Sequence, residues 1–201
     1  MLSLSAVLVC AVAYSLTPPP DIRHRLSMAT AYAALSFLSA SLMLGPWNVL
    51  RRRPTPVSYD LRRDVGIIAG ILALVHTGIG LTVHLRGRMW MYFFKTLHPL
   101  RLQASAFGAA NYIGLMAAAL FATLLALSND WSLRALGTAR WKNLQRWTYA
   151  AFMLTLVHSV LFQFVEKRRM AWILFFATAV LTTLAAQSLG YLQRRRTAKS
   201  N

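Results

Sequence analysis

The sequence predicts an all-α, polytopic membrane bundle of about six transmembrane helices. Of its 201 residues, 57% are hydrophobic and only 13% are charged, whereas a soluble domain carries about 25% charged residues. The charges are also grouped between long uncharged stretches, as expected when lipid surrounds the helices. Because no connecting segment is long enough for a second domain, residues 1–201 are expected to form a single transmembrane domain.

Six apolar segments approach the length of roughly 20 residues that a spanning helix needs. They cover residues 2–16, 26–47, 65–85, 107–127, 144–165 and 170–192. The first is short and ends at three prolines, residues 18–20. It could instead be a signal peptide, since Ala11-Val12-Ala13 resembles a cleavage site. Its start lacks the positive region of such signals, so a retained helix is expected.

The net charge of +17 would suggest a nucleic-acid partner in a soluble protein. Here the basic residues lie at the ends of apolar segments, so we interpret them as topology determinants and headgroup contacts of a lipid bilayer, with no nucleic acid. More of them fall on the side that contains the connecting segments 51–63 and 134–146 and the C-terminal residues 194–199. This side, with both termini, is expected in the cytoplasm.

Histidines are the main candidate metal ligands. Cys10 is the only cysteine, which excludes an internal disulfide and a Cys-based zinc or iron–sulfur site. Of the five histidines, only His76 and His158 lie deep in apolar segments, the third and the fifth. Ionisable residues in such positions are usually functional.

The two deep histidines lie at matched depth. His76 is about 11 residues into its segment and His158 about 14, so both lie about 17 to 21 Å from the side on which these two segments start. Histidines at one level on parallel helices can ligate a haem iron from both sides. The alternatives are core histidines hydrogen-bonded to threonine or backbone, and a proton relay.

Small residues accompany both histidines. One set shares the His76 face of its helix, and Ala151 lies one heptad before His158. Such residues leave room for a porphyrin, and they would equally allow close helix packing. The set on the His76 face consists of Gly66, Gly70, Ala73, Thr77 and Gly80.

The remaining candidates lie near segment ends or in connecting segments. His84 is about 12 Å along the helix from His76 and cannot share its iron. His84 could instead bind a haem propionate or a quinone headgroup, or it could bind no ligand.

Arg86 and Arg101 are expected to be headgroup anchors, with a propionate contact as the alternative. They belong to the longest connecting segment, 86–106, where a short interfacial helix is expected over 89–96. His24 and His98 are expected in loops.

Two stretches are similar to a known family. The first is Arg62-Arg63-Asp64-Val65-Gly66 followed by His76. The second runs from Ala126-Leu127-Ser128 through Leu136-Gly137, Trp141-Lys142-Asn143-Leu144 and Tyr149 to His158. In order and spacing they resemble the ferric-reductase-like transmembrane superfamily, and specifically its MsrQ branch. That branch is the haem-binding membrane subunit of the periplasmic methionine-sulfoxide reductase system.

The resemblance implies an electron-transfer subunit of the bacterial inner membrane. It implies haem b at His76 and His158. The electron donor would be a quinol or a flavoprotein, and the acceptor a periplasmic molybdenum-containing reductase. A quinone is a possible further cofactor, and flavin is implied only through a partner. The family has a histidine where this chain has Gln145, so one haem is expected rather than two. Gln145 itself stays a candidate cofactor contact. The alternatives are a self-contained ferric or cupric reductase and a non-redox transporter or assembly protein with a His76–His158 proton relay.

Overall fold

The computed structural model describes residues 1–17, 21–51 and 59–200, and it confirms the all-α membrane bundle. Pro18, Pro19, Pro20, Arg52 and Arg53, used above for segment ends and charge, lie outside the described residues. Within the described chain, five helical segments are long and apolar enough to cross a membrane when α5 and α6 count as one. The α-helices are α1 (Leu2–Leu16), α2 (Ile22–Leu50), α3 (Tyr59–Val83), α4 (Ala106–Leu127), α5 (Asp130–Gln145), α6 (Thr148–Glu166) and α7 (Met170–Ser200).

Capping residues explain two helix starts. α2 begins four residues before the apolar stretch because the Asp21 carboxylate accepts a hydrogen bond from the Arg23 backbone N–H at 2.9 Å. α4 begins after Ser105, whose hydroxyl accepts from the Gly108 backbone N–H at 3.2 Å. Each cap satisfies one of the four backbone donors that a helix N-terminus leaves unpaired.

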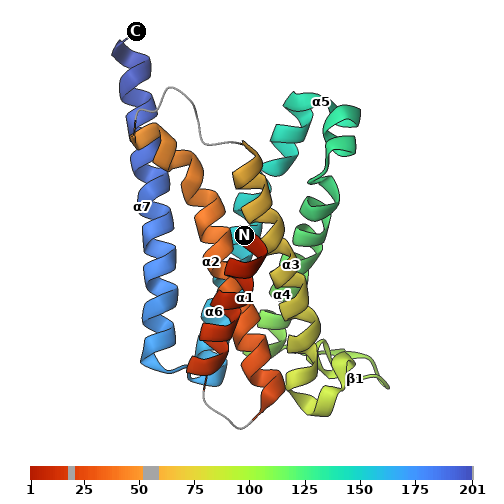
Figure 1. Cartoon of the computed structure of the whole chain (residues 1–201). Coiled ribbons are helices and arrows are strands. Elements are labelled where there is room, and N and C mark those ends of the chain that lie inside the picture. The colour runs from red at the N-terminus through yellow and green to blue at the C-terminus, as the bar shows by residue number, and fades with distance from the viewer. Residues whose placement is uncertain (18–20, 52–58, 201) are drawn as a thin grey trace.

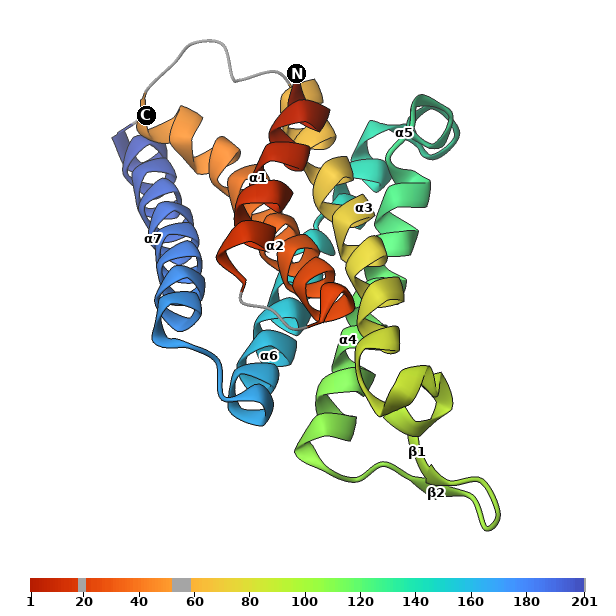
Figure 2. The same cartoon turned by 60° about the horizontal axis from the view of Figure 1, so that its bottom comes forward.

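The helices form a bundle with two distinct ends (Figure 1). At one end lie α5 and the C-terminus, here called the α5 end; at the other lie β1 and the turn from α6 to α7, here called the hairpin end. The central helix α2 packs against α1, α3 and α7, while α6 packs on α4. Leu38 and Leu42 of α2 are almost fully buried in the core. α3 and α6 both run from the α5 end towards the hairpin end (Figures 1 and 2).

Two connecting segments differ from the sequence expectation. Residues 130–145, expected as a connection, form α5, which is interrupted at Gly137 with φ 71° and ψ 156°. This backbone conformation is essentially restricted to glycine. In the segment 86–106, the helix expected over 89–96 is only the short 3₁₀ turn η2 (Met89–Tyr92), preceded by η1 (Leu85–Gly87). A small antiparallel hairpin follows, formed by β1 (Phe94–Thr96) and β2 (Arg101–Leu102).

Candidate functional site

His76 of α3 and His158 of α6 lie opposite each other inside the bundle. Their ring centroids are 6.2 Å apart and their planes are inclined by 76°. Both rings line one cavity, here called the histidine cavity, which extends from Phe121 in the core to Glu166 and Arg168 at the hairpin end. The matched depth predicted from the sequence therefore corresponds to direct proximity between the two side chains.

The hydrogen bonds of the two rings determine their tautomers. Nδ1 of His76 lies 2.9 Å from the Ser27 carbonyl oxygen of α2, and Nδ1 of His158 lies 2.8 Å from the Ala110 carbonyl oxygen of α4. A carbonyl oxygen can only accept, so each Nδ1 carries the proton and donates it. In the neutral ring, Nε2 then keeps a free lone pair, and this is the arrangement that metal-binding histidines commonly have.

Glycines provide space beside both rings. A methyl group added at Gly114 of α4 would lie 2.6 Å from Nδ1 of His158, which is closer than real side chains approach. On α3, Gly80 lies beside the His76 ring, and Ala73 and Thr77 line the same cavity. Ala151 is fully buried. Small residues thus allow the two rings to occupy the space between α2 and α3 on one side and α4 and α6 on the other.

Not all small residues of the His76 face serve this cavity. Gly66 and Gly70 line a second cavity towards the α5 end. A methyl group at Gly70 would lie 2.9 Å from the Leu125 side chain. Gly70 therefore allows α3 to pack closely on α4, and Gly66 lies against Ser41 of α2. Close helix packing was the alternative interpretation of the pattern.

Two imidazoles are too few ligands for a bare metal ion, but they could serve as the protein ligands of a haem iron. Within the described residues, no three His, Cys, Asp or Glu side chains are grouped so that they could hold a metal ion. Haem needs only two protein ligands, because the macrocycle supplies the other four. Imidazole nitrogens bind metals at about 2 Å, which places the centres of two opposed rings about 6 Å apart. The separation of 6.2 Å agrees with this value.

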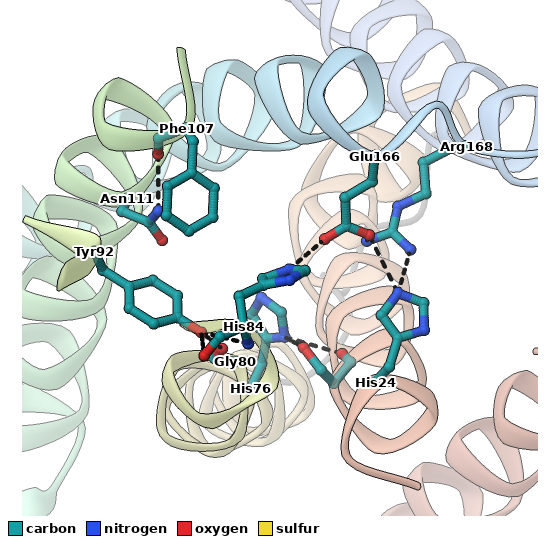
Figure 3. Close-up of polar contacts among 10 residues, drawn as sticks. His24, His76, Gly80, His84, Tyr92, Phe107, Asn111, Glu166 and Arg168 are labelled. Carbon is teal, nitrogen blue, oxygen red and sulfur yellow. Dashed lines mark hydrogen bonds and ion pairs between the residues drawn. The ribbon is translucent and has the colours of Figure 1, made fainter. Parts of the chain in front are cut away.

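An ionic cluster lines the hairpin end of the histidine cavity (Figure 3). The Glu166 carboxylate lies 2.9 Å from Nε2 of His84, 3.1 Å from Nε2 of His24 and 2.6 Å from the Arg168 guanidinium. The Glu166 and Arg168 side chains are only 13% and 15% exposed. The carboxylate thereby connects the ends of α2, α3 and α6.

Arg168 also approaches His24 directly. Its Nη1 lies 3.2 Å from the same Nε2 that contacts Glu166. An arginine can only donate and a carboxylate can only accept, so the His24 nitrogen bonds one of the two at a time. Which of the two contacts is a hydrogen bond depends on the tautomer of His24.

Tyr92 positions His84 from the loop side. The Tyr92 hydroxyl accepts from the His84 backbone N–H at 2.7 Å and faces the Gly80 and His84 carbonyl oxygens at 3.1 and 3.2 Å. Burial raises the pKa of the Tyr92 phenol, while the hydrogen bond to the His84 backbone lowers it. The protonated hydroxyl satisfies backbone groups that the end of α3 leaves open, and it fixes His84 beside Glu166.

The other candidates are spread over the molecule. His84 lines the histidine cavity, and Gln145 lines the second cavity instead. Arg86 lies in η1 and Arg101 in β2, and neither is among the described residues that line the histidine cavity. His24, expected in a loop, belongs to the first turn of α2, because Asp21 caps that helix. His98 lies between β1 and β2, in a loop as expected.

Sequence reasoning missed the roles of Glu166 and Arg168. Glu166 is one of only five acidic residues in the chain, and it directly follows an apolar segment. That rarity was an available signal. Its two histidine partners could not be inferred, since they come from the beginning of α2 and the end of α3.

Comparison with known proteins gives no match, either to a protein-family model or to a curated protein. The assignment of the site therefore depends on its geometry and on the motif resemblance described above.

Proposed function

We propose that this chain is a b-type haem-binding transmembrane electron-transfer subunit with His76 and His158 as the two axial ligands. One observation supports this above the others. Two histidines on facing helices line one cavity, and each has its Nδ1 proton bound by a backbone carbonyl, so that Nε2 remains available. A haem held by these two residues would supply one-electron transfer.

The protein's own residues have three tasks in this proposal. The Ser27 and Ala110 carbonyls hold the two imidazoles in a fixed tautomer and orientation. Gly80 and Gly114 keep the space beside the rings open. At the hairpin end, Glu166 and Arg168 form a mostly buried ion pair that links the end of α6 to His24 and His84.

We further propose the bacterial inner membrane as the location, with the α5 end and both termini in the cytoplasm. The bias of Lys and Arg towards that side supports this orientation. A quinol or flavoprotein would donate electrons, and a periplasmic reductase of the methionine-sulfoxide type would accept them. Both partners come from the family resemblance, and one haem rather than two follows from Gln145.

The proton-relay alternative is less well supported by the geometry. A relay histidine must receive a proton at one ring nitrogen and release it from the other. In both rings, however, Nδ1 is engaged by a backbone carbonyl within the bundle. A self-contained ferric or cupric reductase would use the same histidines, and it would differ by reducing chelated iron directly when supplied with a flavin donor.

A reduced-minus-oxidised absorption spectrum, with the haem-to-protein ratio, tests the proposal. We expect sharp low-spin bands and about one haem per chain. His76→Ala and His158→Ala should each abolish the bands. His98→Ala, which changes an exposed loop histidine, should leave them unchanged. A colourless, correctly folded wild-type protein after expression with ample haem would refute the haem assignment and favour the relay.

A further inference from the structure

The second cavity is distinct in position and chemistry from the histidine cavity. It has a volume of about 710 Å³ and lies between the helices at the α5 end. Leu38 and Phe121, both buried, line both cavities and form the layer that separates them. The proposed haem ligands take no part in the second cavity, so its function can be considered independently of them.

Positive charge dominates the lining. Five basic side chains contribute to it, and no carboxylate occurs among the described residues of the lining. Arg63 is bound to Asp130 at 2.7 Å, outside the cavity. Concentrated charge of one sign in a partly enclosed space favours a ligand of the opposite charge. We call this space the basic cavity; its cationic residues are Arg62, Arg63, Lys142, Arg146 and Arg194.

Helix length predicts that the cationic groups lie at the level of the lipid headgroups. Arg194 follows Met170, the first residue of α7, by 24 residues, which is about 36 Å along the helix. Arg62 precedes Val83, the last residue of α3, by 21 residues, or about 32 Å. The hydrocarbon core is about 30 Å thick. If both helices begin their crossing at the hairpin end, the two guanidinium groups meet the opposite headgroup layer.

The inner part of the cavity is apolar, and uncharged polar groups lie between the two zones. Leu38, Phe121 and Leu124 form the apolar part. Among the polar groups, the Asn48 side-chain oxygen is buried and has no hydrogen-bond partner among the described residues. It can accept from a hydroxyl group. A ligand that matches all three zones has an anionic phosphate, hydroxyl groups and hydrocarbon, which excludes a simple inorganic ion.

From these observations we propose that the basic cavity binds an anionic phospholipid, with the headgroup phosphate among the arginines and acyl carbon against the apolar zone. Basic pockets between transmembrane helices on the cytoplasmic side recognise anionic headgroups in this way. Phosphatidylglycerol has the required phosphate and glycerol hydroxyls. A soluble phosphate compound would satisfy only the cationic zone.

Native mass spectrometry of the full-length protein in neutral detergent tests this inference. Wild-type protein titrated with phosphatidylglycerol should retain one lipid, whereas phosphatidylcholine with the same acyl chains should be lost. Arg146→Gln/Arg194→Gln changes two exposed side chains of the lining. Each basic group near an anionic lipid contributes about 1 kcal/mol, so retention should weaken about 30-fold.

Two variants serve as controls. Arg88→Gln/Lys95→Gln removes the same charge from exposed positions at the hairpin end and should retain the lipid as the wild type does. Arg146→Lys/Arg194→Lys keeps the charge and should retain most of the binding. Circular dichroism on the same samples verifies folding, and the haem spectrum should be unchanged in all four proteins.

Several results would overturn the inference. Equal retention of phosphatidylglycerol and phosphatidylcholine would exclude recognition of the anionic headgroup. Equal weakening by the two glutamine variants would show a nonspecific effect of net charge. If millimolar inorganic phosphate displaces phosphatidylglycerol completely and protects the protein from heat equally well, the ligand is a free phosphate and not a lipid. None of these results depends on whether the histidine cavity holds haem.

Discussion

At the residue scale, Gly114 is the position with the least tolerance near the histidine pair. The His158 ring occupies the space that any side chain at this position would fill, and its Nδ1 is held by the Ala110 carbonyl one turn earlier on α4. The glycine and the carbonyl thus act together, since one provides the space and the other fixes the ring within it. Gly78 on α3 differs, because an added methyl group there would meet nothing within 4 Å.

Gly114→Ala should therefore displace the His158 ring. Overpacking in a tight interior typically costs about 1–3 kcal/mol, and a displaced ring should lower the haem-to-protein ratio. Thermal unfolding in detergent and the pyridine haemochrome ratio measure the two effects. Gly78→Ala is the matched control; it should leave the haem-to-protein ratio unchanged and should not lower the melting temperature. Wild-type values for Gly114→Ala would mean that α4 and α6 can separate without cost.

At the scale of single elements, α5 shows how one glycine bends a helix. Gly137 combines φ 71° with ψ 156°, and the chain continues as helix on both sides. The indole N–H of Trp141, in the second half, donates to the Leu127 carbonyl at 2.8 Å and attaches α5 to the end of α4. The bend thus directs Trp141, Lys142 and Gln145 towards the basic cavity.

Gly137→Ala is expected to destabilise this element, because alanine adopts the observed backbone conformation at a cost of about 1–3 kcal/mol. For a protein of this size, the melting temperature should fall by roughly 2–4 °C per kcal/mol. Differential scanning fluorimetry in detergent measures this change. The haem spectrum should be retained, since α5 contributes nothing to the described lining of the histidine cavity. An unchanged melting temperature would contradict the assigned strain.

At the scale of the whole molecule, Glu166 joins three helix ends that are far apart in sequence. Its partners His24, His84 and Arg168 belong to α2, to the residue after α3, and to the turn after α6. The pair of Arg63 and Asp130 at the α5 end is much more open, with Asp130 67% exposed. The two ion pairs should contribute differently to the free energy of unfolding because they differ in burial. Exposed ion pairs contribute little, whereas removing one partner of a buried pair leaves an uncompensated charge.

Glu166→Gln should consequently destabilise the protein by about 1–3 kcal/mol, since Arg168 loses its carboxylate and the two histidines are left with one amide oxygen as acceptor. Asp130→Asn is the control and should cost at most about 1 kcal/mol. Thermal unfolding at equal detergent concentration compares the two variants. An equal effect of both substitutions would indicate that the hairpin end is more hydrated than its burial suggests.

The orientation of the whole molecule is tested by reporter fusions. A C-terminal alkaline phosphatase, which is active only outside the cytoplasm, should be inactive, and a C-terminal fluorescent protein should fluoresce. A phosphatase fused in the β1–β2 hairpin should be active. The physical reason is the excess of Lys and Arg at the α5 end. The opposite pattern would place the hairpin end in the cytoplasm.

Charge and hydropathy alone were sufficient to predict the class of fold. The positions of the apolar segments in the sequence follow from the length that a bilayer requires, and α2, α3, α4, α6 and α7 each contain most of the segment predicted for it. α5 was missed because its composition is polar and its glycine interrupts the helical pattern. The hairpin was missed because strands of three and two residues leave no periodic signal.

For the candidate site, the sequence by itself determined that His76 and His158 lie deep and at one level, because depth depends only on position along a helix of known rise. Only the tertiary structure decided which nitrogens are available, since Nδ1 is engaged by carbonyls of Ser27 and Ala110, on two further helices. It also separated Gln145 from the histidines and brought Glu166 to His24 and His84. Contacts between helices depend on rotation and packing, and these are properties of the folded bundle rather than of any one segment.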